Sequence, residues 1–268
     1  MDFKKYTQNS FFMIAGPCVV ESETLCMNVA QQLKKIGEEL HIPFIFKASY
    51  KKANRTSVQS FSGIGDEKAL KILEKVKTVF DIPILTDVHE TKDVDLVKDI
   101  IDIIQIPAFL CRQTELIQKA AATMKPVNIK KGQFVSAQTM ILATEKVSSM
   151  GNTQYMLTER GTFLGYEDLV VDMRNIPRMK QSGAIVIYDS THSIQQPGKM
   201  GTSSGGVRDM IEPLTWAAIA AGADGVFVET HPDPRAGLSD AGSMLPLKDF
   251  KAFISKAKSV FELAKTLQ

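Results

Sequence analysis

The sequence has no marked excess of charge of either sign. Lys and Arg number 32 and Asp and Glu number 30, which gives the 268 residues a formal net charge of +2. Proteins that bind nucleic acids or membrane surfaces usually carry a basic excess. The near balance therefore argues against both classes of partner, and any site for anionic ligands must be local.

Cysteine and long apolar runs are also scarce. Only Cys18, Cys26 and Cys111 occur, and an odd, small number in a chain of this length argues against a disulfide framework. The first ten residues lack the apolar run and cleavage site of a signal peptide. No stretch approaches the length of a membrane-spanning helix. We therefore expect a protein of the reducing cytoplasm.

Several well-known motifs are missing as well. The chain contains no Gly-x-Ser-x-Gly, P-loop or Cys-x-x-Cys pattern. AGPC, which follows the first apolar run, is not the Gly-rich turn of a dinucleotide-binding sheet. No linker or low-complexity tract divides the chain, so we expect residues 1–268 to form a single domain.

What the chain does contain is a repeated alternation of two patterns. Short, apolar runs rich in β-branched residues are each followed by polar or Gly-rich residues and then by an amphipathic segment. The runs are residues 12–15, 43–46, 83–86, 103–106, 127–129, 155–157, 185–188 and 225–228. Helical patterns include residues 21–39, 67–80, 210–221 and 247–267.

Eight such repeats in about 250 residues predict a single (β/α)8 TIM barrel of the α/β class. Residues 1–11 precede the first strand, and we expect this N-terminal extension to cap the bottom of the barrel. A doubly wound open sheet is the structural alternative.

Polar groups gather where the predicted strands end. The second run leads into the basic stretch KASYKKANRTS, residues 47–57. In a TIM barrel the carboxyl ends of the strands form one mouth. Six cations would meet there: Lys47, Lys52, Arg55, Arg112, Lys130 and Arg160. Such a pocket predicts a small, multiply anionic ligand, or two of them. A solvated basic loop is the alternative for residues 47–57 alone.

A second group of side chains shares the predicted mouth. Cys18, His192, Glu229 and Asp240 follow the first, seventh and eighth runs, which are neighbours in a closed barrel. Thiolate, imidazole and carboxylates suit a divalent metal such as Zn²⁺, Fe²⁺ or Mn²⁺. Taken singly, Cys18 is as well explained as a small buried residue and His192 as a structural histidine.

Two further features leave alternatives open. Lys47 or Lys130 could form a Schiff base at a strand end, as in class I aldolases, although both lie among other cations. The Gly-rich residues 198–206 (GKMGTSSGG) predict a lid or phosphate-contacting loop, and a plain surface loop explains them equally well.

Eight motifs in order along nearly the whole chain resemble the 3-deoxy-D-manno-octulosonate 8-phosphate synthase family. They are AGPC-x-x-ES, FKASYKKANRTS, TDVHE, IIQIPAFLCRQT, VNIKKGQF, LTERGT, YDSTHSIQ-x-PG and VFVETHPDP. The resemblance implies a transferase that condenses phosphoenolpyruvate with D-arabinose 5-phosphate and water. The implied products are the eight-carbon sugar acid phosphate used for lipopolysaccharide and inorganic phosphate.

The resemblance also implies roles for particular residues. Phosphoenolpyruvate would be bound by Lys47, Gln105, Arg112, Lys130 and Arg160. D-arabinose 5-phosphate would be bound by Asn54, Arg55, Thr56, Gln195 and Ser204. Lys52 would lie near the reacting centre, where Cys18, His192 and Asp240 would also act. Most members of the family have Ser at the position of Thr56, and the hydroxyl is kept.

The family divides on its use of metal, and this chain resembles the metal-dependent class. That class has Cys where metal-independent members have Asn, and here the residue is Cys18. Cys18, His192, Glu229 and Asp240 would then be the metal ligands. The family is usually tetrameric, so the resemblance also implies a homotetramer.

The nearest alternative is 3-deoxy-D-arabino-heptulosonate 7-phosphate synthase, which uses erythrose 4-phosphate. That family typically has a KPRTS-like motif where this chain has KANRTS, so Asn54 distinguishes the two. A Schiff-base aldolase and a non-catalytic phosphate-binding barrel are alternatives from other classes.

Overall fold

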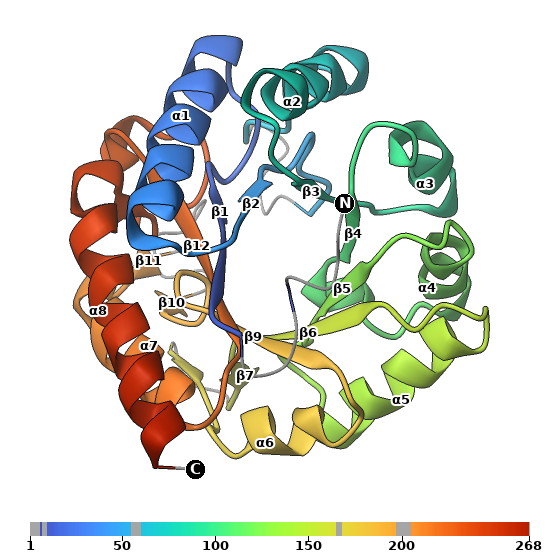
Figure 1. The fold of residues 1–268 in the computed structure, drawn as a ribbon. Helices are drawn as coiled ribbons and strands as arrows, with labels where there is room; N and C mark the ends of the chain where they lie inside the picture. Colours follow the sequence, from blue (N-terminus) through green and yellow to red (C-terminus); the bar gives the residue numbers. More distant parts are fainter. Residues whose placement is uncertain (1–5, 7–9, 55–59, 165–167, 197–204, 268) are drawn as a thin grey trace.

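Eight parallel strands close into a barrel in the computed structural model, which describes residues 6, 10–54, 60–164, 168–196 and 205–267. Each strand pairs with the next, and the last pairs back to the first (Figure 1). In barrel order the strands are β1 (Phe12–Gly16), β2 (Phe44–Lys47), β3 (Ile84–Asp87), β4 (Ile103–Ile106), β5 (Val127–Lys130), β6 (Tyr155–Glu159), β9 (Ile185–Asp189) and β12 (Gly225–His231). The predicted (β/α)8 barrel is confirmed, and closure between β12 and β1 excludes the open sheet.

Eight helices form the outer ring around the strands in Figure 1. They are α1 (Glu23–Leu40), α2 (Asp66–Phe80), α3 (Thr91–Val97), α4 (Thr114–Ala121), α5 (Ala137–Ser148), α6 (Asn175–Lys180), α7 (Ile211–Ala220) and α8 (Leu247–Thr266). Across the described ranges, none of the helices combines the length and apolarity needed to cross a membrane.

Several short elements lie in the loops that follow the carboxyl ends of the barrel strands. They are the 3₁₀ turns η2 (Ala108–Leu110), η3 (Arg208–Met210) and η4 (Pro234–Ala236), and the two-residue strands β7 (Thr162–Phe163), β8 (Leu169–Val170), β10 (Gln195–Gln196), β11 (Gly205–Gly206) and β13 (Leu245–Pro246). Of the Gly-rich residues 198–206, only the last two lie within the described residues.

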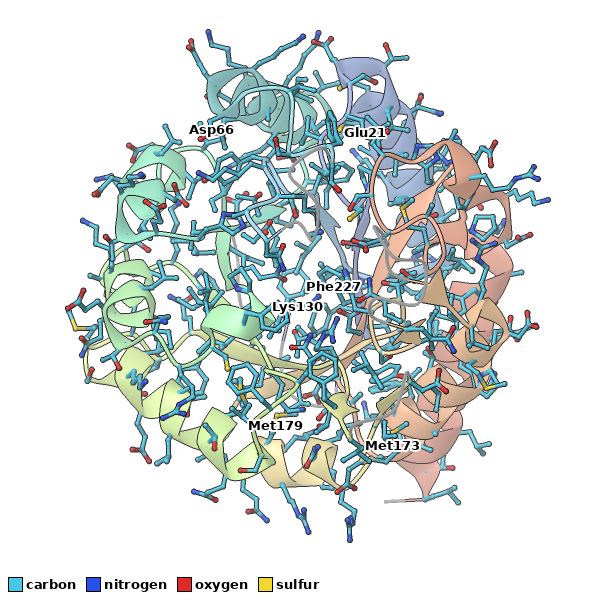
Figure 2. The ribbon with its side chains drawn as sticks, turned by 180° about the vertical axis from the view of Figure 1, so that it is seen from behind. Glu21, Asp66, Lys130, Met173, Met179 and Phe227 are labelled. Carbon is cyan, nitrogen blue, oxygen red and sulfur yellow. The ribbon has the colours of Figure 1, made fainter. Side chains whose placement is uncertain are left out.

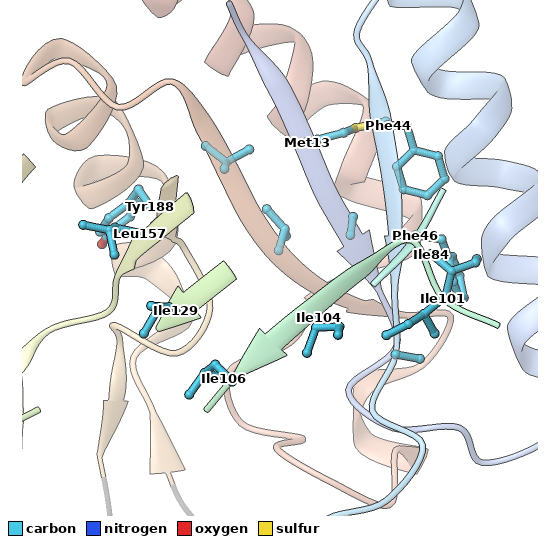
Figure 3. Packing of buried hydrophobic residues seen from close by; sticks show 14 of the residues in the cluster. Met13, Phe44, Phe46, Ile84, Ile101, Ile104, Ile106, Ile129, Leu157 and Tyr188 are labelled. Atoms are coloured by element: carbon cyan, nitrogen blue, oxygen red, sulfur yellow. The ribbon is translucent and has the colours of Figure 1, made fainter. Parts of the chain in front are cut away.

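The core has two layers because successive strand residues face opposite sides of the sheet. In β1, Met13 packs outward against the helices, while Phe12 and Ile14 fill the barrel. Figure 3 shows the outer layer, in which Phe44, Phe46 and other strand residues pack together. Strands buried on both faces read as continuous apolar runs, which is why the sequence located all eight.

One residue of the N-terminal extension is described. Tyr6 is buried in the inner layer, with its ring edge-on to Phe12 at 5.2 Å and its hydroxyl donating to the Phe44 carbonyl at 3.4 Å. This contact is compatible with a capping role for residues 1–11, which stays a prediction because most of the extension lies outside the described residues.

Several observed strands end one or more residues beyond the apolar runs that predicted them. β2, β3 and β5 each end on a polar residue: Lys47, Asp87 and Lys130. The backbones of these residues pair with neighbouring strands, while their side chains line the cavity at the barrel mouth. These three side chains therefore stand on rigid sheet rather than on loops.

Candidate active site

A cavity of about 340 Å³ opens at the carboxyl ends of the strands. It is lined by Lys47, Ser49, Lys52, Ala53, Asn54, Asp87, His89, Glu90, Gln105, Pro107, Ala108, Phe109, Leu110, Lys130, Gln133, Arg160, His192 and Glu229. Eight of the predicted site residues are in this set, and they follow six different strands. The volume and polar lining suit small organic substrates.

Lys47 is the most completely enclosed of the cavity's lysines. Its side chain is 2% exposed, and its Nζ donates to Glu229 Oε1 at 2.6 Å and to the Cys18 carbonyl at 3.0 Å. Although burial alone would raise the pKa of Glu229, the charges of His192, Lys47 and Lys52 hold it well below its usual range. A buried, charged pair therefore joins the end of β2 to β12.

Lys130 lies over the aromatic ring of Phe227, a buried residue of β12. Its Nζ forms an ion pair with Asp189 and lies 4.0 Å from the centre of the Phe227 ring, as Figure 2 shows near the middle of the barrel. Lys47 Nζ lies 5.4 Å from the same ring. Burial lowers the pKa of Lys130, and the nearby charges of Lys47 and Arg160 add to this effect, while Asp189 opposes it.

Arg160 presents one free face toward the cavity. Its Nη2 donates to Gln195 Oε1 at 3.0 Å, while its buried Nη1 meets no hydrogen-bond partner among the described residues. Glu159 fixes the adjoining turn by accepting from the backbone N–H groups of Arg160 and Gly161 at 2.9 and 2.7 Å. An oriented guanidinium with an unused donor is suited to an anionic group such as phosphate.

Gln105 is oriented by a buried chain of side-chain hydrogen bonds. Asn128 Nδ2 donates to Gln105 Oε1 at 3.0 Å, and Thr158 Oγ1 donates to Asn128 Oδ1 at 2.7 Å. With its carbonyl oxygen occupied, Gln105 offers its Nε2 donor to a ligand. Side chains from β4, β5 and β6 thereby orient the Gln105 amide in the cavity that Lys130 also lines.

Lys52 and Asn54 form the more open side of the cavity. Burial alone would lower the pKa of Lys52, but its interactions with Cys18 and with the carboxylates of Glu229, Asp87 and Asp240 raise it above its ordinary value. Lys52 is therefore protonated at neutral pH and can stabilise negative charge that develops on a substrate.

Three of the four predicted metal ligands come together beside the cavity. Ligand atoms of Cys18, Glu229 and Asp240 all lie within 4.8 Å of one another, and Cys18 Sγ donates to Asp240 Oδ2 at 3.0 Å. The fourth, His192, has its Nε2 at 3.5 Å from Glu229 Oε2 and its Nδ1 at 2.9 Å from Asp189 Oδ2. Burial raises the pKa of the Cys18 thiol well above its ordinary value, and the charge of Glu229 raises it further.

This donor set fits a divalent transition metal. Glu229 Oε2 is buried and has no hydrogen-bond partner in the described part of the chain, and an orphaned buried carboxylate oxygen is costly unless it binds a cation. Sulfur, imidazole and carboxylate donors together are the ligands that zinc and iron accept.

Not every predicted residue reaches the cavity. Arg112 is exposed and is not among the described lining residues, because the 3₁₀ turn η2 carries it to the outer rim. The expected role of Arg112 in binding phosphoenolpyruvate therefore stays a prediction. Gln195 lies behind Arg160 and donates to Asp240 Oδ1 at 3.0 Å. Arg55, Thr56 and Ser204 lie outside the described residues.

Several residues of the site were not predicted from the sequence. Phe227 was read as ordinary core because it sits in an apolar run. Asp87 and His89, which belong to the motif TDVHE, form a 3.0 Å contact at the cavity wall. Gln133 lines the cavity with a buried Oε1 that finds no partner within the described ranges. A polar residue at a strand end, or within three positions after it, was the available signal for Asp87, His89 and Gln133.

The sequence of this chain is similar to those of known proteins. Residues 3–266 match the family model described as the DAHP synthetase I family. A protein of Dichelobacter nodosus named 2-dehydro-3-deoxyphosphooctonate aldolase is 48% identical over 266 residues, which cover 99% of this chain and 96% of that protein. Proteins of the same name from Hydrogenovibrio crunogenus and Nitrosococcus oceani are 50% and 48% identical, covering 95% and 98% of this chain and 92% and 94% of theirs.

Proposed function

The chain belongs to the DAHP synthetase I family, and from this premise we propose that it is a 3-deoxy-D-manno-octulosonate 8-phosphate synthase. It condenses phosphoenolpyruvate with D-arabinose 5-phosphate and water, and supplies the eight-carbon sugar acid phosphate for lipopolysaccharide. Relatives about half identical over nearly the whole chain carry the name of an enzyme acting on that eight-carbon compound. They favour this reaction over the seven-carbon one.

One observation carries the proposal: a single cavity joins two groups of ligand-binding residues. Lys130, Arg160 and Gln105 are buried donors that suit the phosphate of phosphoenolpyruvate. Lys52 and Asn54 stand at the open side, where a second, longer substrate can enter. Two phosphorylated substrates can thus meet in one enclosed space.

The bond changes follow from the two substrates. C3 of the enol attacks the aldehyde carbon and forms the new C–C bond, and the aldehyde oxygen takes up a proton to become a hydroxyl. Water adds at C2, and the C2–O bond to phosphate then breaks, which releases inorganic phosphate and leaves a ketone. Lys47 balances the substrate carboxylate, while the ammonium of Lys52 donates a hydrogen bond to the oxygen that becomes negative.

The metal is part of the proposal. Cys18, His192, Glu229 and Asp240 would hold a divalent ion, and such an ion supplies Lewis-acid polarisation or an activated water. The clustered ligand atoms and the orphaned Glu229 oxygen support this assignment. We expect chelator treatment to abolish activity and added Zn²⁺, Fe²⁺ or Mn²⁺ to restore it. Full activity of rigorously metal-free protein would contradict the assignment.

We also propose that the enzyme is a homotetramer of the cytoplasm. At the cavity mouth, Phe109 and Phe134 stack on each other while about half of each ring remains exposed, at 50% and 53%. Exposed, adjoining aromatic rings are typical of subunit interfaces. Cys18, Cys26 and Cys111 are free, buried thiols, as a reducing compartment allows.

A phosphate-release assay tests the function. Phosphoenolpyruvate is offered with D-arabinose 5-phosphate, with erythrose 4-phosphate or with no sugar, and we expect rapid release only with the first. Faster release with erythrose 4-phosphate would instead indicate the seven-carbon synthase. A lysine adduct after borohydride reduction, detected by intact mass, would indicate a Schiff-base aldolase.

A further inference from the structure

The loop that leaves β2 is held from outside the cavity by one lysine. Lys51 is not among the described residues that line the cavity, in contrast to its neighbour Lys52. Its Nζ donates to Asp93 Oδ1 at 3.0 Å and to Asp66 Oδ2 at 3.3 Å, and it lies 5.0 Å from the centre of the Tyr50 ring. The ammonium therefore joins the loop to the first turns of α2 and α3.

Asp93 is a rigid partner for this ammonium. Its side chain is 2% exposed, and its Oδ2 accepts from the backbone N–H groups of His89 and Glu90 at 2.9 and 3.0 Å. The bond from the Glu90 N–H is one half of the reciprocal cap at the start of α3, in which the Glu90 side chain accepts from the Asp93 N–H. Because His89 also contacts Asp87 at the cavity wall, Asp93 fixes Lys51 relative to the end of β3.

The returning arm of the loop is attached at the same place. The Lys52 N–H donates to the Ser62 carbonyl at 2.8 Å. Gly63 packs so closely that an added Cβ would lie 3.3 Å from the Tyr50 carbonyl and 3.5 Å from the Lys51 Cα. The two arms and two helices thus meet around the Lys51 side chain, directly beside Lys52.

We propose that Lys51 is a positioning residue for the sugar phosphate, which holds Lys52 and Asn54 at the cavity through Asp93 and Asp66. The proposal rests on the function proposed above. Lys51 touches neither substrate, so its loss should loosen the sugar side of the cavity and leave the Lys130–Arg160 side intact. Asp93 keeps its two backbone donors when Lys51 is replaced, so the fold is retained.

Steady-state kinetics of Lys51→Met, Lys51→Arg and the parent enzyme test this proposal. We expect Lys51→Met to raise the KM for D-arabinose 5-phosphate about tenfold, as misplaced binding groups do, and to lower kcat because Lys52 is displaced with Asn54. The KM for phosphoenolpyruvate should change less than about twofold. Lys51→Arg should restore most of the loss because it keeps the charge. Lys71→Met, which breaks an exposed ion pair with Glu67 on α2, is the matched control.

The outcomes separate the two proposals. An inactive parent enzyme would overturn the proposed function, whereas an active parent with an unchanged sugar KM in Lys51→Met would overturn the role of Lys51. An equal rise in both KM values, or a fall in kcat alone, would indicate a general structural role. If Lys51→Met does not fold, the same kinetics are measured on Asp66→Asn, which weakens the second contact of Lys51. A rise of about threefold in the KM for D-arabinose 5-phosphate would support the proposal, and an unchanged KM would refute it.

Discussion

At the residue scale, three lysines within residues 47–52 have three different functions. Lys47 is paired with Glu229 inside the barrel, Lys52 faces the cavity and Lys51 binds Asp93 outside it. Their basic charge looks uniform in the sequence, but the partner of each side chain decides its role. The strand carries Lys47, and the loop that follows turns the other two in opposite directions.

Phe227 should contribute to substrate binding although it is apolar. We expect Phe227→Leu to raise the KM for phosphoenolpyruvate roughly fivefold, because a ring beneath a lysine contributes about 0.5–2 kcal/mol. Phe253→Leu is the control, since Phe253 is equally buried but packs on Trp216 in the helical layer. Both variants should lose similar thermal stability. An unchanged KM in Phe227→Leu would show that the ring only fills space.

At the scale of the elements, the strands position the site and their ends lie close together. An added Cβ at Gly16, where β1 ends, would lie 2.0 Å from the carbonyl oxygen of Lys47 on β2. Only glycine allows the two strand ends to approach this closely. The position of Lys47 therefore depends on a residue that carries no side chain.

We expect Gly16→Ala to lose about 3 kcal/mol or more of unfolding free energy, because backbone atoms must move to relieve the overlap. It should also lose most activity. Gly183→Ala is the comparison: it has φ of +80° but nothing within 4 Å of the added Cβ, so it should cost only about 1–2 kcal/mol. Urea unfolding followed by circular dichroism measures both, and equal losses would refute the close-approach argument.

Sequence patterns located the strands better than they located the site. Every barrel strand was predicted because its body is apolar on both faces. The polar residues that end several of these strands, such as Lys47, Asp87 and Lys130, looked like loop in the sequence. No pattern predicted the turn η2 after β4, and Arg112, which follows this turn, is exposed and is not among the described lining residues. Phe227 was missed because an apolar residue under a lysine is indistinguishable from core in the sequence. Contacts between strand ends depend on barrel closure, which local patterns do not contain.

At the scale of the whole molecule, buried pairs of opposite charge surround the cavity. The cations around the cavity are matched by buried carboxylates in the pairs Lys47–Glu229, Lys130–Asp189 and Lys131–Glu159. Buried pairs of this kind add little net stability while intact, but breaking one is costly. The molecule is therefore sensitive to protonation of these carboxylates.

Stability should fall in acid below about pH 4. Burial alone would raise the pKa values of Asp87 and Asp189, but His89 holds the first, and His192 with Lys130 holds the second, below the usual range. A depressed folded-state pKa stabilises the fold above the unfolded pKa of about 3.9, and this contribution is lost as pH falls further.

Thermal melting between pH 6 and pH 3 measures this effect. We expect a nearly constant melting temperature down to about pH 5 and a steep fall below about pH 4. Asp189→Asn should melt lower at pH 6 and fall less on acidification, while Asp209→Asn, at an exposed position, should follow the parent curve. A melting temperature independent of pH over this range would contradict the role of the buried carboxylates.

The most direct test of the central claim is a competition between two sugar phosphates in one reaction. Metal-loaded enzyme is given phosphoenolpyruvate with equal concentrations of D-arabinose 5-phosphate and erythrose 4-phosphate, and the products are identified by mass spectrometry. The account predicts the eight-carbon acid phosphate as the dominant product, with one inorganic phosphate released for each molecule formed. A dominant seven-carbon product, or neither product, would contradict it.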